Sequence, residues 1–311
     1  DKSNMKKSIL ILTPFLLLIS AYEHASTFIK RSSKHILTNQ PLKFKFGSKS
    51  ARKFPSKQSM TLLPIMPNLA VESLAVNSIG FSALIFSGLA DKMLTKEGCV
   101  HSFVLGNLLW TTLGWQGWSI CTLYLFLGSL VTKIRIKEKQ SKGIAEGRGG
   151  KRGPENVWGS ALTGAICALL SYFTPLEYGP IFKLGFLASL ATKLGDTFSS
   201  EIGKAFGKRT FLITNFKAVS PGTEGAVSVE GTLAGVLGSL ILPLYSTFIG
   251  FSNLRVVWVC ALSAFFANAF ESYVGAKFQK NYDWLSNELV NFINTLVGAC
   301  IAMGILWLKI I

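Results

Sequence analysis

The sequence predicts an all-α polytopic membrane protein: a bundle of about seven (six to eight) transmembrane helices after an N-terminal targeting leader. Of its 311 residues, 49% are hydrophobic and only 15% are charged, whereas soluble domains carry roughly 25% charged residues. Several apolar runs also approach the ~20 residues with which a helix crosses a bilayer. A soluble protein with unusually apolar helices is the alternative, and both observations disfavour it.

Residues 1–60 are predicted to form a signal- and transit-like leader, disordered or removed, before a single transmembrane helical domain over residues 61–311. Two lysines precede the apolar run Ser8–Ser20, which has the length of a signal-peptide core. The stretch that follows is rich in Ser, Lys and Phe and has no acidic residue from His24 to Val71. That composition is typical of transit peptides.

A signal peptide followed by a transit-like segment resembles the bipartite plastid leaders of algae with complex plastids. It therefore predicts a multi-pass protein of a plastid (chloroplast) membrane, with a retained signal anchor as the alternative. The leader holds twelve Lys/Arg against two acids, so +10 of the net charge of +16 lies there. Because this charge is not spread over a folded face, nucleic acid is not predicted as a partner.

Hydropathy predicts the membrane spans in chain order. The second and third spans are short, and Gly114–Trp118 between them is either a turn or a kink in one long tilted helix, so the count is seven or eight. The predicted spans are Leu69–Ala90, Val100–Leu113, Ile120–Val131, Val157–Phe173, Ile181–Ile202, Ser228–Ile249, Val256–Ala276 and Leu289–Ile311.

Loop charges predict which ends of these spans share one side of the membrane. Lys133–Glu155 holds eight basic residues, and Lys204–Gly225 and Lys277–Glu288 are basic as well. The alternate loops Thr174–Pro180 and Gly250–Leu254 contain neither Lys nor Arg. This is the positive-inside asymmetry, and it places the three basic loops on one side.

Four segments then bring polar residues to the basic side. Gly195–Gly231 holds four of the chain's 16 acidic residues. An Asp at the centre of a membrane helix costs on the order of 2.5–3.5 kcal/mol on insertion scales, so such residues indicate a functional site. The converging residues are Asp196, Glu201, Glu224, Glu230, Asn268, Glu271, Asn287, Glu288, Asn291 and Asn294.

This set predicts phosphoryl-transfer chemistry. Carboxylate and amide oxygens suit Mg²⁺, and the Gly-rich basic segments 147–159 and 221–225 suit phosphates. The first segment is not a P-loop, because Ala145 and Arg152 occupy positions that need Gly and Ser/Thr. A kinase or transferase is favoured, because phosphoryl transfer needs a metal ion and basic groups that position and neutralise phosphates. A transporter of an anionic or lipid-linked substrate and a structural role are the alternatives.

Three segments also resemble the transmembrane-protein-19-like family, and most closely its plastid branch, the phytyl-phosphate kinases of vitamin E synthesis. They are GRGGKRGPENVWGSALTG, KLGDTFSSEIGKAFGKRTFLITNFKAVSPGTEGAVSVEGTLAG and NELVNFINTLVGA. The resemblance implies transfer of the γ-phosphate of CTP or ATP to phytyl or another isoprenoid monophosphate, giving the diphosphate for tocopherol synthesis. The family's motif positions fall on Asp196, Ser200, Glu201, Gly203, Pro221, Gly222, Thr223, Gly225, Gly231, Glu271, Asn287, Glu288 and Asn291.

With this resemblance, each candidate residue receives an expected role. The expected catalytic residues are Asp196, Glu201, Glu224, Glu271 and Glu288, with Mg²⁺ on Asp196, Glu201 and Glu224. The residues expected to bind the nucleotide and its phosphates are Arg148, Lys151, Arg152, Lys217 and Thr223. The residues expected to bind the isoprenoid phosphate are Asn268, Asn287 and Asn291.

Overall fold

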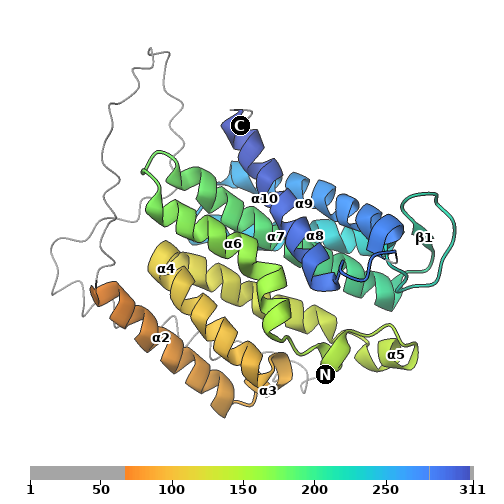
Figure 1. Ribbon diagram of the computed structural model, residues 1–311, viewed down its shortest axis with the longest axis horizontal. Coiled ribbons are helices and arrows are strands. Elements are labelled where there is room, and N and C mark those ends of the chain that lie inside the picture. Colours follow the sequence, from red (N-terminus) through yellow and green to blue (C-terminus); the bar gives the residue numbers. More distant parts are fainter. Residues whose placement is uncertain (1–66, 280, 309–311) are drawn as a thin grey trace.

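The computed structural model describes residues 67–279 and 281–308, and these form a bundle of helices (Figure 1). The predicted leader, residues 1–60, lies outside the described residues. The α-helices are α2 (Pro67–Phe86), α3 (Ala90–Met93), α4 (Lys96–Thr132), α5 (Ile136–Ser141), α6 (Pro154–Phe173), α7 (Gly179–Phe206), α8 (Val229–Phe248), α9 (Leu254–Val274) and α10 (Asn287–Trp307). A 3₁₀ turn η1 (Gly147–Gly150), a π-helical turn η2 (Gly275–Gln279) and two short strands, β1 (Thr210–Leu212) and β2 (Ala226–Ser228), complete the described chain.

The prediction of an all-α membrane protein is confirmed. Five helices in the described part are long and apolar enough to cross a membrane: α2, α6, α8, α9 with η2, and α10. The two strands pair antiparallel, with Phe211 opposite Val227, and form a small hairpin outside the bundle. The predicted first span ends earlier than expected, because the chain leaves α2 after Phe86 and turns at Gly88, whose φ is 66°.

α7 is the central helix, and it packs against α4, α6, α8, α9 and α10. Its residues from Leu184 to Gly195 are all buried. A helix enclosed by other helices is not exposed to lipid, so it tolerates polar residues that a peripheral helix does not. This position explains why the most polar of the long helices lies in the middle of the bundle.

Glycines bring α8 against α7 at close range. A Cβ added at Gly231 would lie 2.7 Å from the Ser199 carbonyl oxygen, and one at Gly238 would lie 2.7 Å from Cγ of Phe198. At Gly235 it would lie 3.0 Å from Cβ of Ser199. Small residues allow such backbone approach between membrane helices. These glycines therefore serve helix packing.

Gly114 reverses the chain inside α4, where its φ of 70° and ψ of −170° are not helical. Gly98 near the start of α4 and Gly128 near its end both lie against Arg152. Thirty residues of straight helix would separate these glycines by about 45 Å. α4 is therefore two antiparallel arms, as Figure 1 shows, and the predicted short spans are joined by a turn.

The three basic loops meet at one end of the bundle, which we call the basic end. Arg135 donates a hydrogen bond to the Ala205 carbonyl oxygen (3.1 Å), which joins the first loop to the end of α7. A Cβ on Gly222 would lie 2.6 Å from the Ile144 side chain, so the second loop packs on the first. The topology expected from loop charges agrees with this arrangement.

Candidate functional site

A polar cavity of about 420 Å³ lies at the basic end. Its walls come from α6, α7, the ends of α9 and α10 and the loops between them. The predicted site residues that line it are Lys151, Arg152, Asp196, Glu201, Thr223, Glu224, Glu271, Asn287 and Asn291. Segments far apart in the sequence thus place acidic, basic and amide groups around one space.

Lys193 ties α7 to α10 on one wall of this cavity. Its ammonium lies 2.5 Å from Asp196 Oδ2 and 2.5 Å from Asn291 Oδ1, and the residue is only 7% exposed. A buried ammonium is tolerated when it is paired and hydrogen-bonded. The pairing fixes the Asp196 carboxylate at the cavity wall.

Glu271 of α9 brings a second carboxyl group to Asp196. The two side chains are within hydrogen-bonding distance, and Glu224 lies within electrostatic reach of Glu271. Two carboxylates in contact need a proton or a cation between them. Glu271 also accepts a hydrogen bond from the Asn294 amide. This acidic cluster is the part of the cavity best suited to a hard cation.

Asn294 supports the cluster from behind. Its amide nitrogen donates to Asn268 Oδ1 (3.0 Å) as well as to Glu271. Its own carbonyl oxygen is buried and has no hydrogen-bond partner among the residues that the structure describes. Asn294 is fully buried and is not among the residues that line the cavity, so it positions Glu271 and Asn268 rather than contacting a ligand.

Glu201 lies deeper and is paired differently from Asp196. α7 continues without a break past Gly203 to Phe206, so Glu201 faces α5 rather than α10. One carboxylate oxygen pairs with Lys139, and the other lies 3.2 Å from Lys204. Lys139 is 1% exposed and also donates to the Thr132 carbonyl oxygen (2.8 Å). This ion-paired cluster closes the cavity beneath the first basic loop.

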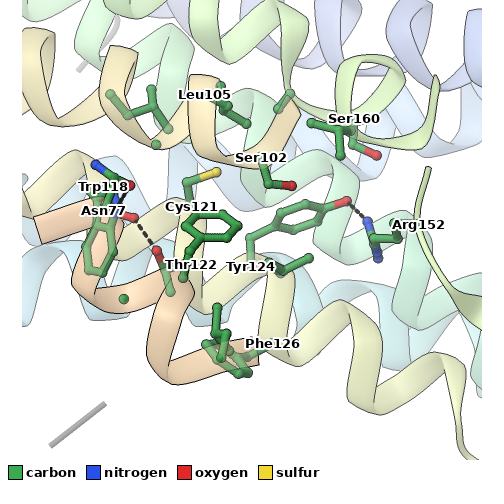
Figure 2. A pocket seen from close by; sticks show the side chains of 18 of the residues that line it. Asn77, Ser102, Leu105, Trp118, Cys121, Thr122, Tyr124, Phe126, Arg152 and Ser160 are labelled. Carbon is green, nitrogen blue, oxygen red and sulfur yellow. Dashed lines mark hydrogen bonds between the residues drawn. The ribbon is translucent and has the colours of Figure 1, made fainter. Parts of the chain in front are cut away.

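Arg152 and Lys151 bring positive charge to the cavity lining. Arg152 is held through its backbone, which bonds to Met93 and Thr95, and through its guanidinium, which donates to the Tyr124 hydroxyl (2.6 Å; Figure 2). Near them, burial and the charges of Lys92 and Lys151 lower the pKa of Lys133. Clustered ammonium groups of this kind favour an anion nearby.

The segment 221–225 packs between two neighbours. Gly222 and Gly225 have φ of 87° and 73°, a conformation that glycine adopts without strain. A Cβ on Gly225 would clash with the backbone at Ala276, so the loop lies directly on the end of α9. Thr223 donates to the Ser220 carbonyl oxygen (2.8 Å), which fixes the turn and places Glu224 at the cavity.

Four predicted site residues are not among those that line the cavity. Arg148 pairs with Glu155 and bonds to Asn156 Oδ1 (2.7 Å) at the rim. Glu288 lies 3.4 Å from the Asn156 amide. Lys217 is exposed in the β1–β2 connection, and Asn268 bonds to Asn294 behind the wall.

Within the described residues, no group of three or more His, Cys, Asp or Glu side chains has the arrangement of a metal site. Binding of Mg²⁺ by Asp196, Glu201 and Glu224 therefore stays a prediction. The oxygen donors at Asp196 and Glu271 are of the kind that Mg²⁺ takes.

The prediction from sequence omitted several residues of the site. Lys193 shares a helix face with Asp196 at i, i+3, and that spacing was the available signal. The roles of Lys139 and Tyr124 depend on partners from distant segments, so no local pattern reveals them, whereas Lys204 pairs with Glu201 at i, i+3 within α7. Asn156 and Ser160 line the cavity from the first two turns of α6, and Asn156 lies just before the predicted span Val157–Phe173.

The chain matches the family described as integral membrane protein DUF92 over residues 79–299. It is 51% identical over 214 residues to an uncharacterized membrane protein of Synechocystis sp. The matched residues make up 69% of this chain and 83% of that protein. It is 42% identical over 214 residues to Protein VTE6, chloroplastic, of Arabidopsis thaliana, covering 68% of this chain and 64% of that protein. An uncharacterized membrane protein of Methanocaldococcus jannaschii is 32% identical over 213 residues, 68% of this chain and 86% of its own length. No solved structure matches.

Proposed function

The chain belongs to the DUF92 family of integral membrane proteins, and we propose that it is a membrane-bound kinase for an isoprenoid monophosphate. It would transfer the γ-phosphate of CTP or ATP to phytyl phosphate, giving phytyl diphosphate for tocopherol synthesis. The similarity to Protein VTE6, chloroplastic, and the resemblance of the motifs to plastid phytyl-phosphate kinases support this substrate and a plastid membrane.

One observation carries the proposal: carboxylates and basic side chains line the same polar cavity at the basic end of a membrane bundle. Asp196, Glu224 and Glu271 supply the carboxylates, and Lys151 and Arg152 supply positive charge. Phosphoryl transfer depends mainly on positioning and charge neutralisation, and these two kinds of group supply both.

In the proposed reaction, a phosphate oxygen of the lipid attacks the γ-phosphorus of the nucleotide. The bond from that phosphorus to the β–γ bridging oxygen breaks, and the nucleoside diphosphate leaves with the bond's electron pair. The acceptor phosphate is anionic at neutral pH, so no side chain has to remove a proton from it. The protein's task is to hold two anions in contact.

In this proposal Asp196, Glu271 and Glu224 would hold Mg²⁺, because their oxygens are the ligands that this ion takes. Asp196 and Glu271 are in contact, with Glu224 close by, and all three supply oxygen ligands. When bound, Mg²⁺ neutralises charge on the nucleotide's phosphate oxygens. Lys193 orients Asp196. Glu201 was expected to be a further ligand, and in this fold its oxygens accept from Lys139 and Lys204.

The remaining expected residues receive roles from their positions. Lys151 and Arg152 would contact phosphate groups directly, and Thr223 would hold Glu224 in place. Asn287 and Asn291 line the cavity at the start of α10, where they can donate to a phosphate oxygen. Arg148, Lys217, Glu288 and Asn268 would act from the rim or from behind the wall.

A transporter is the alternative that the sequence left open. The polar cavity is lined by loops and by helix residues near the basic end. Transporter substrate sites lie near the bilayer midplane and are reached from the two sides in turn, whereas a kinase needs access from one side only. The position of the cavity at one end of the bundle favours the kinase.

The test is an assay on purified full-length protein in detergent, with phytyl phosphate, Mg²⁺ and CTP or ATP labelled at the γ-phosphate. We expect labelled phytyl diphosphate with at least one nucleotide, and none when EDTA removes the metal. Folded, monodisperse protein that yields no labelled diphosphate with either nucleotide would exclude the kinase. A transporter would instead show activity only in sealed vesicles.

A further inference from the structure

A second cavity, whose surface is mostly apolar, lies between α2, both arms of α4 and the start of α6 (Figure 2). α2 packs mainly on α4 and forms the outer wall. The residues that line it include Gly80, Leu109, Trp118, Cys121, Tyr124 and Val157.

The apolar cavity meets the polar cavity at three residues. Arg152, Asn156 and Ser160 line both spaces. Figure 2 shows Arg152 and Ser160 at one end of the apolar cavity, with Tyr124 pointing its hydroxyl toward the guanidinium. A cationic group therefore stands where an apolar compartment opens into the candidate reaction site.

A polar contact lies at the far end of the apolar cavity from Arg152. Trp118 donates to Asn77 Oδ1 (3.0 Å), and Asn77 is fully buried. Trp118 lies ten residues along the second arm from Gly128, which is against Arg152, or about 15 Å of helix. This is roughly half of the ~30 Å hydrocarbon core, the depth that a lipid chain in one leaflet occupies.

We propose that this apolar cavity binds the isoprenoid chain of the lipid monophosphate, with Arg152 holding the phosphate where the two cavities meet. The identity of the ligand rests on the proposed kinase function. The Asn77–Trp118 contact at the far end would limit how long a chain the cavity accepts. The cavity is small, about 90 Å³, and one guanidinium stands at its junction with the polar cavity, so the proposed ligand is a phosphate with a single chain rather than a two-chain lipid.

Gly80 offers a way to fill the cavity. A Cβ added there meets nothing within 4 Å although the glycine is buried, so its missing side chain points into the empty space. Gly80→Phe should occupy the deeper part of the cavity without displacing the backbone, and Gly80→Ala should occupy little of it. Gly304 of α10 also has open space around its Cβ and lines neither cavity, so Gly304→Phe is the matched control.

The experiment measures equilibrium binding of phytyl phosphate and of the shorter geranyl phosphate to purified full-length protein in detergent, without nucleotide. We expect Gly80→Phe to weaken binding of phytyl phosphate at least tenfold and to change geranyl phosphate binding less than twofold. Gly80→Ala and Gly304→Phe should bind both lipids like the wild type. Retained geranyl phosphate binding also shows that the Gly80→Phe protein is folded.

Three results would overturn the proposal: phytyl phosphate affinity unchanged in Gly80→Phe, equal loss of both lipids in folded protein, or displacement of phytyl phosphate by equimolar dioleoyl phosphatidic acid. The last would make the cavity a general lipid site. Binding is measured without turnover, so the kinase proposal fails separately. Chain-length-dependent binding with no phosphorylation by CTP or ATP would refute the kinase and support the cavity.

Discussion

At the scale of single residues, the bundle holds its internal charges in pairs between helices. Lys193 joins Asp196 to Asn291, and Lys139 joins α5 to Glu201. Breaking a buried pair is costly because one charge is left without its partner. The two pairs nonetheless differ, because Asp196 reaches the cavity beside a second carboxyl group and Glu201 has both oxygens engaged by lysines.

Asp196→Asn should lower the rate of phosphorylation at least 100-fold in protein that still folds, because Lys193 keeps its bond to Asn291 and has a second carboxylate, Glu271, nearby. The substitution keeps the shape of the side chain and removes the charge that would hold Mg²⁺ on the nucleotide. The measurement is initial rates at saturating Mg²⁺, nucleotide and phytyl phosphate. Asp283→Asn, in an exposed loop and outside the cavity lining, is the control and should retain wild-type rates. Equal rates in Asp196→Asn and wild type would refute the metal role.

Glu201→Gln should mainly destabilise the protein, because it leaves the buried Lys139 ammonium without a countercharge. Loss of one partner of a buried pair costs about 3–5 kcal/mol. The measurement is Tm in detergent, and the double variant Glu201→Gln/Lys139→Met should recover most of the loss. An unchanged Tm together with lost activity would instead assign Glu201 to the metal, as the sequence predicted.

The sequence predicted the members of the acidic cluster because chain direction alone determines which helix ends meet. It could not predict their pairing, because pairing depends on the rotation of each helix about its axis. Lys139 and Tyr124 illustrate the limit. Each looks like an ordinary loop lysine or span aromatic until a distant segment supplies Glu201 or Arg152.

At the scale of elements, α7 depends on its neighbours for its place in the membrane. Its polar residues lie in the centre of the bundle because α4, α6, α8, α9 and α10 surround it. The glycines of α8 set the distance between α8 and α7. Hydropathy indicated the span but could not show which helix is central.

Gly238→Val should separate α8 from α7 and lower the Tm, because its side chain would meet Cβ and Cγ of Phe198 at 2.8 and 2.7 Å. Overpacking of this kind costs about 1–3 kcal/mol. The measurement is thermal unfolding in detergent. Gly304→Val makes the same change where space is open and should leave the Tm within error of the wild type; an equal loss in both variants would contradict this account of α8.

For the turn within α4, the sequence predicted two possibilities and could not distinguish them. Gly114–Trp118, between two short apolar runs, fits either a turn or a kink. The left-handed φ of Gly114, together with the packing of Trp110 on Trp118 (ring centroids 5.5 Å apart), determines the turn. Contacts between the arms decide the fold, and they are not local in sequence.

At the scale of the whole molecule, the basic loops lie on one side, and the two short loops without Lys or Arg, 174–180 and 250–254, lie on the other. Lys217→Cys and Glu177→Cys, each in a background without other cysteines, should therefore react from opposite sides of the membrane. In sealed vesicles of one orientation, a membrane-impermeant maleimide should label one of them and label both only after detergent is added. Labelling of both in intact vesicles would contradict the topology.

Because the two cavities meet at Arg152, the proposed lipid site belongs to only one leaflet of the membrane. The apolar cavity reaches about half the depth of the hydrocarbon core from the basic end. A phytyl phosphate would then be drawn from the leaflet on that side, and its diphosphate would return to the same leaflet. The reaction would proceed without flipping a charged headgroup, and product would accumulate only beside the aqueous compartment that supplies the nucleotide.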